Sequence, residues 1–160
     1  MKRIYADIQI RAAVPDDSSR VASVLHESFV EYEALYTQEA FAATAPTREQ
    51  IEGRMREGPV WVALQGDAIV GTAAAVPRGD ELYIRGMAVV PAARGLGIGR
   101  LLLEHSESFA AAHGYRRLIL STTPFLNSAI QLYESYGFRR NDEGPHDLFG
   151  TPIFTMVKNL

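Results

Sequence analysis

The chain has 160 residues, of which 47% are apolar and 22% charged, with a formal net charge of −3 at pH 7. These values are typical of a globular protein with a full hydrophobic core, and we expect residues 1–160 to form one domain. The mild negative charge argues against a nucleic-acid partner bound through a basic surface. The chain has no cysteine, which excludes disulfides, thiolate nucleophiles and cysteine metal ligands.

The sequence shows no segment that would direct it to a membrane. The first residues, MKRIYADIQIR, contain no apolar stretch of the signal-peptide kind, and no run of the chain is long enough to span a bilayer. We therefore expect a cytoplasmic protein with no membrane partner.

The first half of the chain predicts a strand, two helices and a β-hairpin. Apolar alternation predicts the strand, and apolar residues at helical spacing behind Asp and Ser predict the first helix. Thr47 is a candidate N-cap of the second, with a capping-box residue at Glu49 or Gln50. Gly66-Asp67 is typical of a two-residue hairpin. The ranges are 7–14 for the strand, 15–36 and 44–58 for the helices, and 60–65 and 68–76 for the hairpin strands.

The second half predicts alternating strands and helices. The strands are ELYIRGMAVV, RRLILST and TPIFTMVKN, and the helices cover 98–113 and 127–136. Gly114 and Gly137 stand where helix C′ residues belong. The first two strands should be parallel and joined by a right-handed crossover, whereas the hairpin is antiparallel. The fold class is therefore α/β, a mixed sheet with helices on both faces.

Three glycines, Gly95, Gly97 and Gly99, stand where the helix over 98–113 begins, in ARGLGIGRLLLEH. Glycine is disfavoured in helices by up to ~1 kcal/mol relative to alanine. A helix N-terminus offers unpaired amides and partial positive charge to an anion, and glycine lets a phosphate approach them. Arg94 and Arg100 add guanidinium groups that suit phosphate. We interpret this loop as a pyrophosphate site. The alternative is a tight strand-to-helix turn without a ligand.

Two common nucleotide-binding motifs fail on spacing. No Gly-Lys-Ser/Thr follows the glycines, so the loop is not a Walker motif. The pattern G-x-G-x-x-G, counted from Gly95 or Gly97, ends on Arg100 or Leu102, so it is not the Rossmann fingerprint.

The pattern that matches is R-x-x-G-x-G, at Arg94, Gly97 and Gly99. With NSAIQLYESYGF, which contains Asn127 and Tyr133 before a Gly-Phe turn, it resembles the GNAT superfamily of N-acetyltransferases. The resemblance extends to the order of elements over most of the chain. It implies a single N-acetyltransferase domain with a mostly antiparallel sheet, in which LYIRGMAVV and RRLILST form a splayed parallel pair.

The resemblance also implies acetyl-CoA as cosubstrate, with no metal. Backbone groups of Met87, Ala88 and Val89 would pair with the pantetheine arm. One of their amides would face the thioester oxygen and stabilise the negative charge that develops there. The pyrophosphate would be held by the amides of Gly95, Leu96, Gly97, Gly99 and Arg100.

Tyr133 and Asn127 each have two interpretations. Tyr133 lies on an apolar stripe with Ala129 and Leu132, which predicts a core residue, whereas the resemblance implies the proton donor to the thiolate leaving group. Asn127 is a candidate N-cap, and the resemblance implies a hydrogen bond to the pantetheine or to an ordered water. The two roles of Asn127 are compatible.

The sequence does not single out the base that deprotonates the acceptor amine. Relatives often use a glutamate on or near the fourth strand, which makes Glu81 a candidate catalytic residue. It is otherwise a solvated strand end. Glu31 and Glu33 are helix-surface acids or recognise the amine, and His146 lies on a loop.

Arg85 interrupts an apolar strand. It has three interpretations: binding a substrate carboxylate, pointing outward at a sheet edge, or pairing with an acid. The four histidines show no paired metal-ligand spacing, and we predict no metal site.

We therefore expect an enzyme that moves an acetyl group from acetyl-CoA to a primary amine of a small molecule or peptide, directly in a ternary complex. The acidic balance and the segment from Glu31 to Tyr36 lean slightly toward a small cationic amine. The alternatives are an acyl-CoA sensor or interaction module with little catalysis, and a nucleotide-binding domain that uses the same loop. The resemblance also leaves a homodimer open, since relatives are often dimers.

Overall fold

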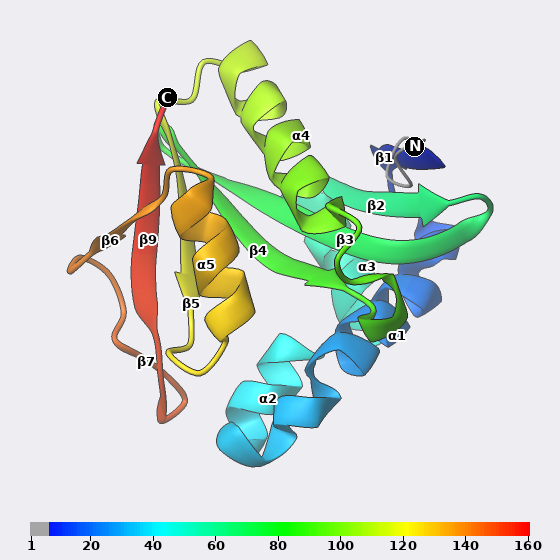
Figure 1. Ribbon diagram of the computed structural model, residues 1–160, viewed down its shortest axis with the longest axis horizontal. Coiled ribbons are helices and arrows are strands. Elements are labelled where there is room, and N and C mark those ends of the chain that lie inside the picture. The colour runs from blue at the N-terminus through cyan, green and yellow to red at the C-terminus, as the bar shows by residue number, and fades with distance from the viewer. Residues whose placement is uncertain (1–6) are drawn as a thin grey trace.

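The computed structural model describes residues 7–160. The expectation that the chain starts without a signal peptide rests in part on the first six residues, which lie outside the described range. Seven strands form one mixed sheet in the order β1-β2-β3-β4-β5-β9-β6, as Figure 1 shows. They are β1 (Ile8–Ala12), β2 (Val60–Gln65), β3 (Ala68–Arg78), β4 (Glu81–Val89), β5 (Arg117–Thr122), β9 (Phe154–Asn159) and β6 (Arg139–Asn141). A separate two-stranded ladder joins β7 (Asp147–Leu148) to β8 (Thr151–Pro152).

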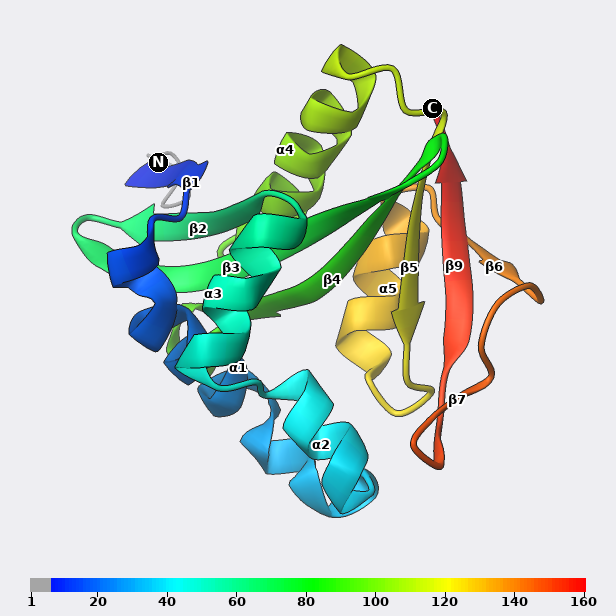
Figure 2. The same ribbon diagram turned by 180° about the vertical axis from the view of Figure 1, so that it is seen from behind.

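The described residues form five α-helices, and four of them cover the two faces of this sheet. They are α1 (Ser18–Phe29), α2 (Gln38–Thr44), α3 (Arg48–Glu57), α4 (Ile98–Ala112) and α5 (Asn127–Ser135). Helices α4 and α5 lie on one face (Figure 1), and α1 and α3 lie on the other (Figure 2). The predicted mixed α/β fold with helices on both faces is confirmed.

The parallel pair β4–β5 is joined only at its start. Its register runs from Glu81↔Arg117 to Tyr83↔Ile119, and beyond that point the strands separate, which is visible as the V between them in Figure 1. A bulge contributes to this divergence, because Gly86, with φ of +57°, and Met87 together face a single residue of β3. Positive φ at this position suits glycine, and such bulges bend a strand. The predicted splay is confirmed, and it leaves one edge of β4 open.

The local turn and capping predictions are confirmed. Thr47 and Gln50 form a capping box at the start of α3, Gly66-Asp67 joins β2 to β3, and Gly114 and Gly137 adopt positive φ just beyond α4 and α5. Helix α2, β6 and β7 were not predicted, and the strand predicted over TPIFTMVKN is divided into β8 and β9. Thr37 is the N-cap of α2, and its hydroxyl accepts a hydrogen bond from the Ala40 amide. Strands β6 and β7 are too short to show a period.

The core lies on both sides of the central strands. Leu82, Leu102 and Leu118 are fully buried between the sheet and α4, and Val24 and Leu25 of α1 close the other face. A second apolar cluster joins α2 to the loop before α5, where the Tyr36 ring packs edge-on against Phe125 at 5.0 Å and against Phe41 at 6.0 Å. This aromatic cluster holds α2 beside the open end of the β4–β5 split. No helix among residues 7–160 has both the length and the apolar character needed to cross a membrane.

Candidate active site

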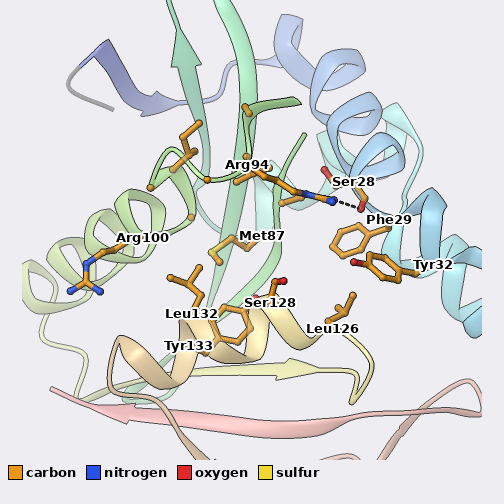
Figure 3. Close-up of a pocket in the computed structure, with 18 residues that line it drawn as sticks. Ser28, Phe29, Tyr32, Met87, Arg94, Arg100, Leu126, Ser128, Leu132 and Tyr133 are labelled. Carbon is orange, nitrogen blue, oxygen red and sulfur yellow. Dashed lines mark hydrogen bonds between the residues drawn. The ribbon is translucent and has the colours of Figure 1, made fainter. Parts of the chain in front are cut away.

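A cleft of about 440 Å³ lies where β4 and β5 separate. Figure 3 shows its walls: the glycine loop and the start of α4 on one side, α5 below, and Ser28, Phe29 and Tyr32 opposite. The sequence-predicted residues that line it are Met87, Ala88, Val89, Arg94, Gly95, Gly97, Gly99, Arg100 and Tyr133. Residues from four separate parts of the chain are thus brought to one cavity.

The glycine loop presents free amides to this cleft. Gly95 and Gly97 adopt φ of +83° and +81°, which turns the chain sharply into α4 with Gly97 as the N-cap. Within residues 7–160, no amide from Gly95 to Arg100 donates to a backbone carbonyl. A side chain at Gly99 would lie 2.8 Å from Leu132 Cδ2. Unpaired amides, a helix N-terminus and the lack of side chains together suit a bound phosphate.

The two arginines beside the glycines are placed differently. Arg94 Nη1 donates to Glu31 at 2.6 Å, and Arg94 Nη2 donates to the Ser28 carbonyl at 2.9 Å, so its guanidinium ties the loop to the end of α1 (Figure 3). Arg100 is half-exposed. It pairs with Glu104 at 3.4 Å and lies over the Tyr136 ring. Arg100 is therefore the more available of the two for a phosphate.

Tyr133 is buried at the centre of the site. Only 8% of the residue is exposed, yet it lines the cleft, and Figure 3 shows its ring beside Leu132 beneath Met87. Burial, with a smaller contribution from Tyr36, raises the pKa of Tyr133 to about 12. The hydroxyl therefore keeps its proton throughout the neutral range, so in a proton transfer there it can serve as the acid and not as the base. The core and catalytic interpretations from the sequence are compatible in this position.

Three predicted site residues do not line the cleft. Leu96 packs against the core instead. Asn127 is exposed, and it is the first residue of α5 rather than its N-cap, which is Leu126 and makes no side-chain cap. The capping prediction for Asn127 is wrong, because the chain enters α5 one residue earlier. Its backbone still lies beside Leu126 and Ser128, which do line the cleft.

Glu81 lies at the closed end of the β4–β5 pair, outside the cleft and outside a second cavity that adjoins the cleft. Its carboxylate accepts a hydrogen bond from Arg117 Nη2 at 2.7 Å, across the first register pair. Glu81 and Met87 are six positions apart on β4, which corresponds to about 20 Å at ~3.3 Å per residue. Glu33 and His146 are exposed and also lie outside both cavities. The structure does not bring these groups to the reacting position.

A second cavity, of about 320 Å³, adjoins the cleft and shares Phe29, Met87, Leu126 and Tyr133 with it. We refer to it as the acceptor cavity. It is lined by Arg85, which also pairs with Glu57 at 3.2 Å, so the interpretation of Arg85 as paired with an acid is confirmed. Arg54 of α3 and Arg78 of β3, which sequence reasoning missed, line it too. Arg54 and Arg78 lie in ordinary polar contexts, and only the fold brings them to Arg85. The described residues contain no cluster of three or more potential metal ligands.

Comparisons with known proteins agree with this geometry. The sequence profile of the acetyltransferase (GNAT) family matches residues 21–138. The chain is 35% identical over 89 residues to probable N-acetyltransferase family 8 member 5 of Mus musculus, covering 52% of this chain and 39% of that protein. It is 39% identical over 85 residues to N-acetylaspartate synthetase of Danio rerio, covering 52% of this chain and 30% of that protein. The chain thus spans less than half the length of these curated relatives.

A solved structure gives the same fold over nearly the whole chain. The PaiA N-acetyltransferase of Thermoplasma acidophilum, in complex with coenzyme A, superposes with a TM-score of 0.82 over 96% of this chain and 99% of that one, at 18% identity. The family profile covers well over half of the sequence, and the splayed sheet and glycine loop are those expected from the resemblance. This chain belongs to the acetyltransferase (GNAT) family.

Proposed function

We propose that the chain transfers an acetyl group from acetyl-CoA to a primary amine, directly, with both substrates bound together. The observation that carries this proposal is that one cleft combines the open edge of β4, the free amides of the glycine loop and the Tyr133 hydroxyl, and opens into a second cavity. The cleft and the acceptor cavity share Met87 and Tyr133 among their lining residues.

The residues of the cleft fit acetyl-CoA along its length. The amides from Gly95 to Arg100 would hold the pyrophosphate, and the β5-facing edge of β4 at Met87, Ala88 and Val89 would pair with the pantetheine arm. Asn127 would contribute from the start of α5. When bound, acetyl-CoA supplies an acetyl group activated as a thioester. A fixed backbone N–H on β4 would stabilise the charge that develops on the thioester oxygen.

Tyr133 would donate its proton, or a hydrogen bond, to the departing sulfur. Its raised pKa keeps the hydroxyl protonated at every pH at which the protein would work. Because the ring is buried and lies between Leu132 and Phe138, the hydroxyl is held in a fixed position, which is what a positioned acid requires.

The acceptor must lose a proton before it attacks, since alkyl amines are mostly ammonium at pH 7. No Asp or Glu of the described chain lines either cavity. We therefore assign this step to water in the acceptor cavity, and not to Glu81.

The test is release of free thiol from acetyl-CoA across a panel of amines. The chain has no cysteine, so the protein adds no background thiol. Amine-dependent release with formation of the N-acetyl product supports the proposal. Tight acetyl-CoA binding with no release from any amine would favour the sensor alternative. Thermal stabilisation by ATP or NAD but not by acetyl-CoA would contradict both and favour a nucleotide-binding domain.

A further inference from the structure

The acceptor cavity is the part of the molecule whose chemistry the family does not determine. It is bounded by β4 and β5, by α3, and by the aromatic cluster around Tyr36. Because it meets the cleft at Met87 and Tyr133, a molecule held there would present its amine to the acetyl group. The charges that line it therefore select the acceptor.

These charges are positive. Arg54, Arg78 and Arg85 line the cavity, and no Asp or Glu of the described chain does. The nearest compensating acid is Glu57, whose side chain is 53% exposed and lies at 3.2 Å from Arg85 Nη2. One carboxylate at the rim thus faces three guanidinium groups. A polyamine or another cationic acceptor would be repelled here, contrary to the slight lean of the sequence toward such amines.

Arg85 has hydrogen-bonding capacity that the protein does not use. Its side chain is 24% exposed, and its Nε and Nη2 atoms are buried without a hydrogen-bond partner among residues 7–160. The contact with Glu57 brings the charges together but does not satisfy these donors. Buried charged donors normally find an acceptor, and a guanidinium edge matches the two oxygens of a carboxylate.

Arg54 reinforces this positive site from the opposite wall. Its Nη2 donates to the Ala43 carbonyl at 3.2 Å, and its Nη1 lies 2.8 Å from where a side chain at Gly86 would begin. Burial, and then the charge of Arg85, lower the pKa of Arg54. Arg54 and Arg85 both line this cavity, and an anion bound there would be attracted by both guanidiniums.

Arg78 is the third arginine that lines the cavity, and its guanidinium lies 3.9 Å above the centre of the Tyr83 ring. Stacking of this kind holds the group in place while leaving its N–H edge free for a ligand. The cavity volume of about 320 Å³ lies near the lower end of the range for small-molecule sites.

From this arrangement we propose that the acceptor is a small primary amine that carries a carboxylate, an amino acid, with its carboxylate bound by Arg85 and Arg54. This specificity rests on the proposed acetyl transfer. To that function it adds the class of acceptor, an amino acid, and it assigns Arg85 and Arg54 as specificity-determining residues.

The experiment compares acids with their matched amides as acceptors. L-Methionine, L-phenylalanine and L-glutamate are assayed beside the corresponding amides, in which every carboxylate is a carboxamide, and beside spermidine. The amine of an amide is less basic than that of the amino acid, so more of it is unprotonated at neutral pH and amine reactivity alone favours the amide. We expect kcat/KM to be higher for at least one acid than for its amide by at least about tenfold, the factor that ~1.4 kcal/mol of binding provides.

Arg85→Gln and Arg54→Gln identify the carboxylate site. Each should raise KM for the preferred acid by at least about tenfold more than it raises KM for the matched amide, with the Kd for acetyl-CoA unchanged. Arg56→Gln is the matched control, because Arg56 is exposed on the same helix and lies outside both cavities. It should behave as the unmodified protein does. Loss of the acid preference in Arg56→Gln as well would contradict the assignment.

A binding measurement separates this inference from the proposed function. N-acetyl-L-methionine and its amide are titrated calorimetrically into the protein saturated with coenzyme A. Tighter binding of the acid, abolished by Arg85→Gln, supports the carboxylate site even if no amine is acetylated and the proposed transfer fails. If the protein acetylates the amides or spermidine as efficiently as the acids, the proposed acetyl transfer is supported and the carboxylate site is contradicted. Equal binding of acid and amide also overturns it.

Discussion

Arg94 and Glu31 form a 2.6 Å ion pair across the opening of the cofactor cleft. They come from parts of the chain 63 positions apart, the glycine loop and the turn that follows α1. With the second bond from Arg94 to the Ser28 carbonyl at 2.9 Å, this pair fixes the loop relative to the helix opposite. An arginine predicted to contact phosphate thus stabilises the shape of the site in the structure described here.

This arrangement predicts a graded effect on cofactor affinity. Arg94→Gln removes both bonds and should raise the Kd for acetyl-CoA by about tenfold, whereas Glu31→Gln leaves the Ser28 bond and should raise it by about twofold, since half-exposed pairs contribute at most ~1 kcal/mol. Both values come from calorimetric titration at low and high salt. A loss of affinity in Arg94→Gln with no loss in Glu31→Gln would contradict this and would assign Arg94 a direct phosphate contact.

Replacing Tyr133 with phenylalanine should separate chemistry from binding. The ring stays packed, and only the proton donor is lost, so kcat should fall by about 10²-fold or more, while the Kd for acetyl-CoA stays within about twofold because the packing is kept. Because the pKa of Tyr133 is about 12, the unmodified enzyme should show no loss of activity from this group as the pH rises to about 10. Unchanged turnover in Tyr133→Phe would remove Tyr133 from the mechanism.

Gly99 is predicted to be required for its lack of a side chain. The new methyl of Gly99→Ala would meet Leu132 Cδ2 at 2.8 Å, so the Leu132 side chain would have to move, at a cost of about 1 kcal/mol. Leu132 also lines the cleft, so both the melting temperature and acetyl-CoA affinity should fall. The added Leu132→Ala change should restore part of the affinity.

Gly95→Ala is the control for this crowding. A side chain there meets no atom within 4 Å, and its φ of +83° supplies the only strain. Leu132→Ala should therefore give no rescue of Gly95→Ala. Rescue of both variants, or of neither, would contradict a steric clash at Gly99.

Glu81 should contribute to stability and not to the chemical step. Glu81→Gln weakens the pair with Arg117, whose side chains are 23% and 28% exposed, and should lower the free energy of unfolding by about 1 kcal/mol. We expect kcat/KM to change by less than about twofold. Denaturant unfolding and the thiol-release assay provide the two values. A large loss of kcat with unchanged stability would restore Glu81 as the base.

His105 predicts a pH dependence of stability. It packs edge-on against Trp61 at 5.1 Å, and burial lowers its pKa. The unfolded chain, with a histidine pKa of about 6.5, binds a proton more readily than the folded protein. Stability from this group is therefore present above about pH 6.5 and is lost as the pH falls through the lower folded pKa. His105→Phe should flatten the fall in melting temperature between about pH 7 and 5; an unchanged slope would refute this.

Much of the architecture follows from local sequence, because it depends on interactions between neighbouring residues. Thr47 and Gln50 cap α3, Gly66-Asp67 turns the hairpin, and Gly114 and Gly137 end their helices with positive φ. Each of these is decided within a few positions of the chain. The loop of Arg94, Gly97 and Gly99 is likewise a local motif, and together with the segment of Asn127 and Tyr133 it carries the resemblance to the family.

Only the tertiary structure decided what the side chains of the site contact. Glu81 and Met87 share a strand, yet the short β4–β5 register puts the first at the closed end and the second in the cleft. Arg54 and Arg85 are 31 positions apart and line one cavity only because the fold brings α3 to the same face of the sheet as Arg85 of β4. Such contacts depend on packing and strand register between distant segments, which no local spacing encodes, and it is these contacts that set the charge of the acceptor cavity.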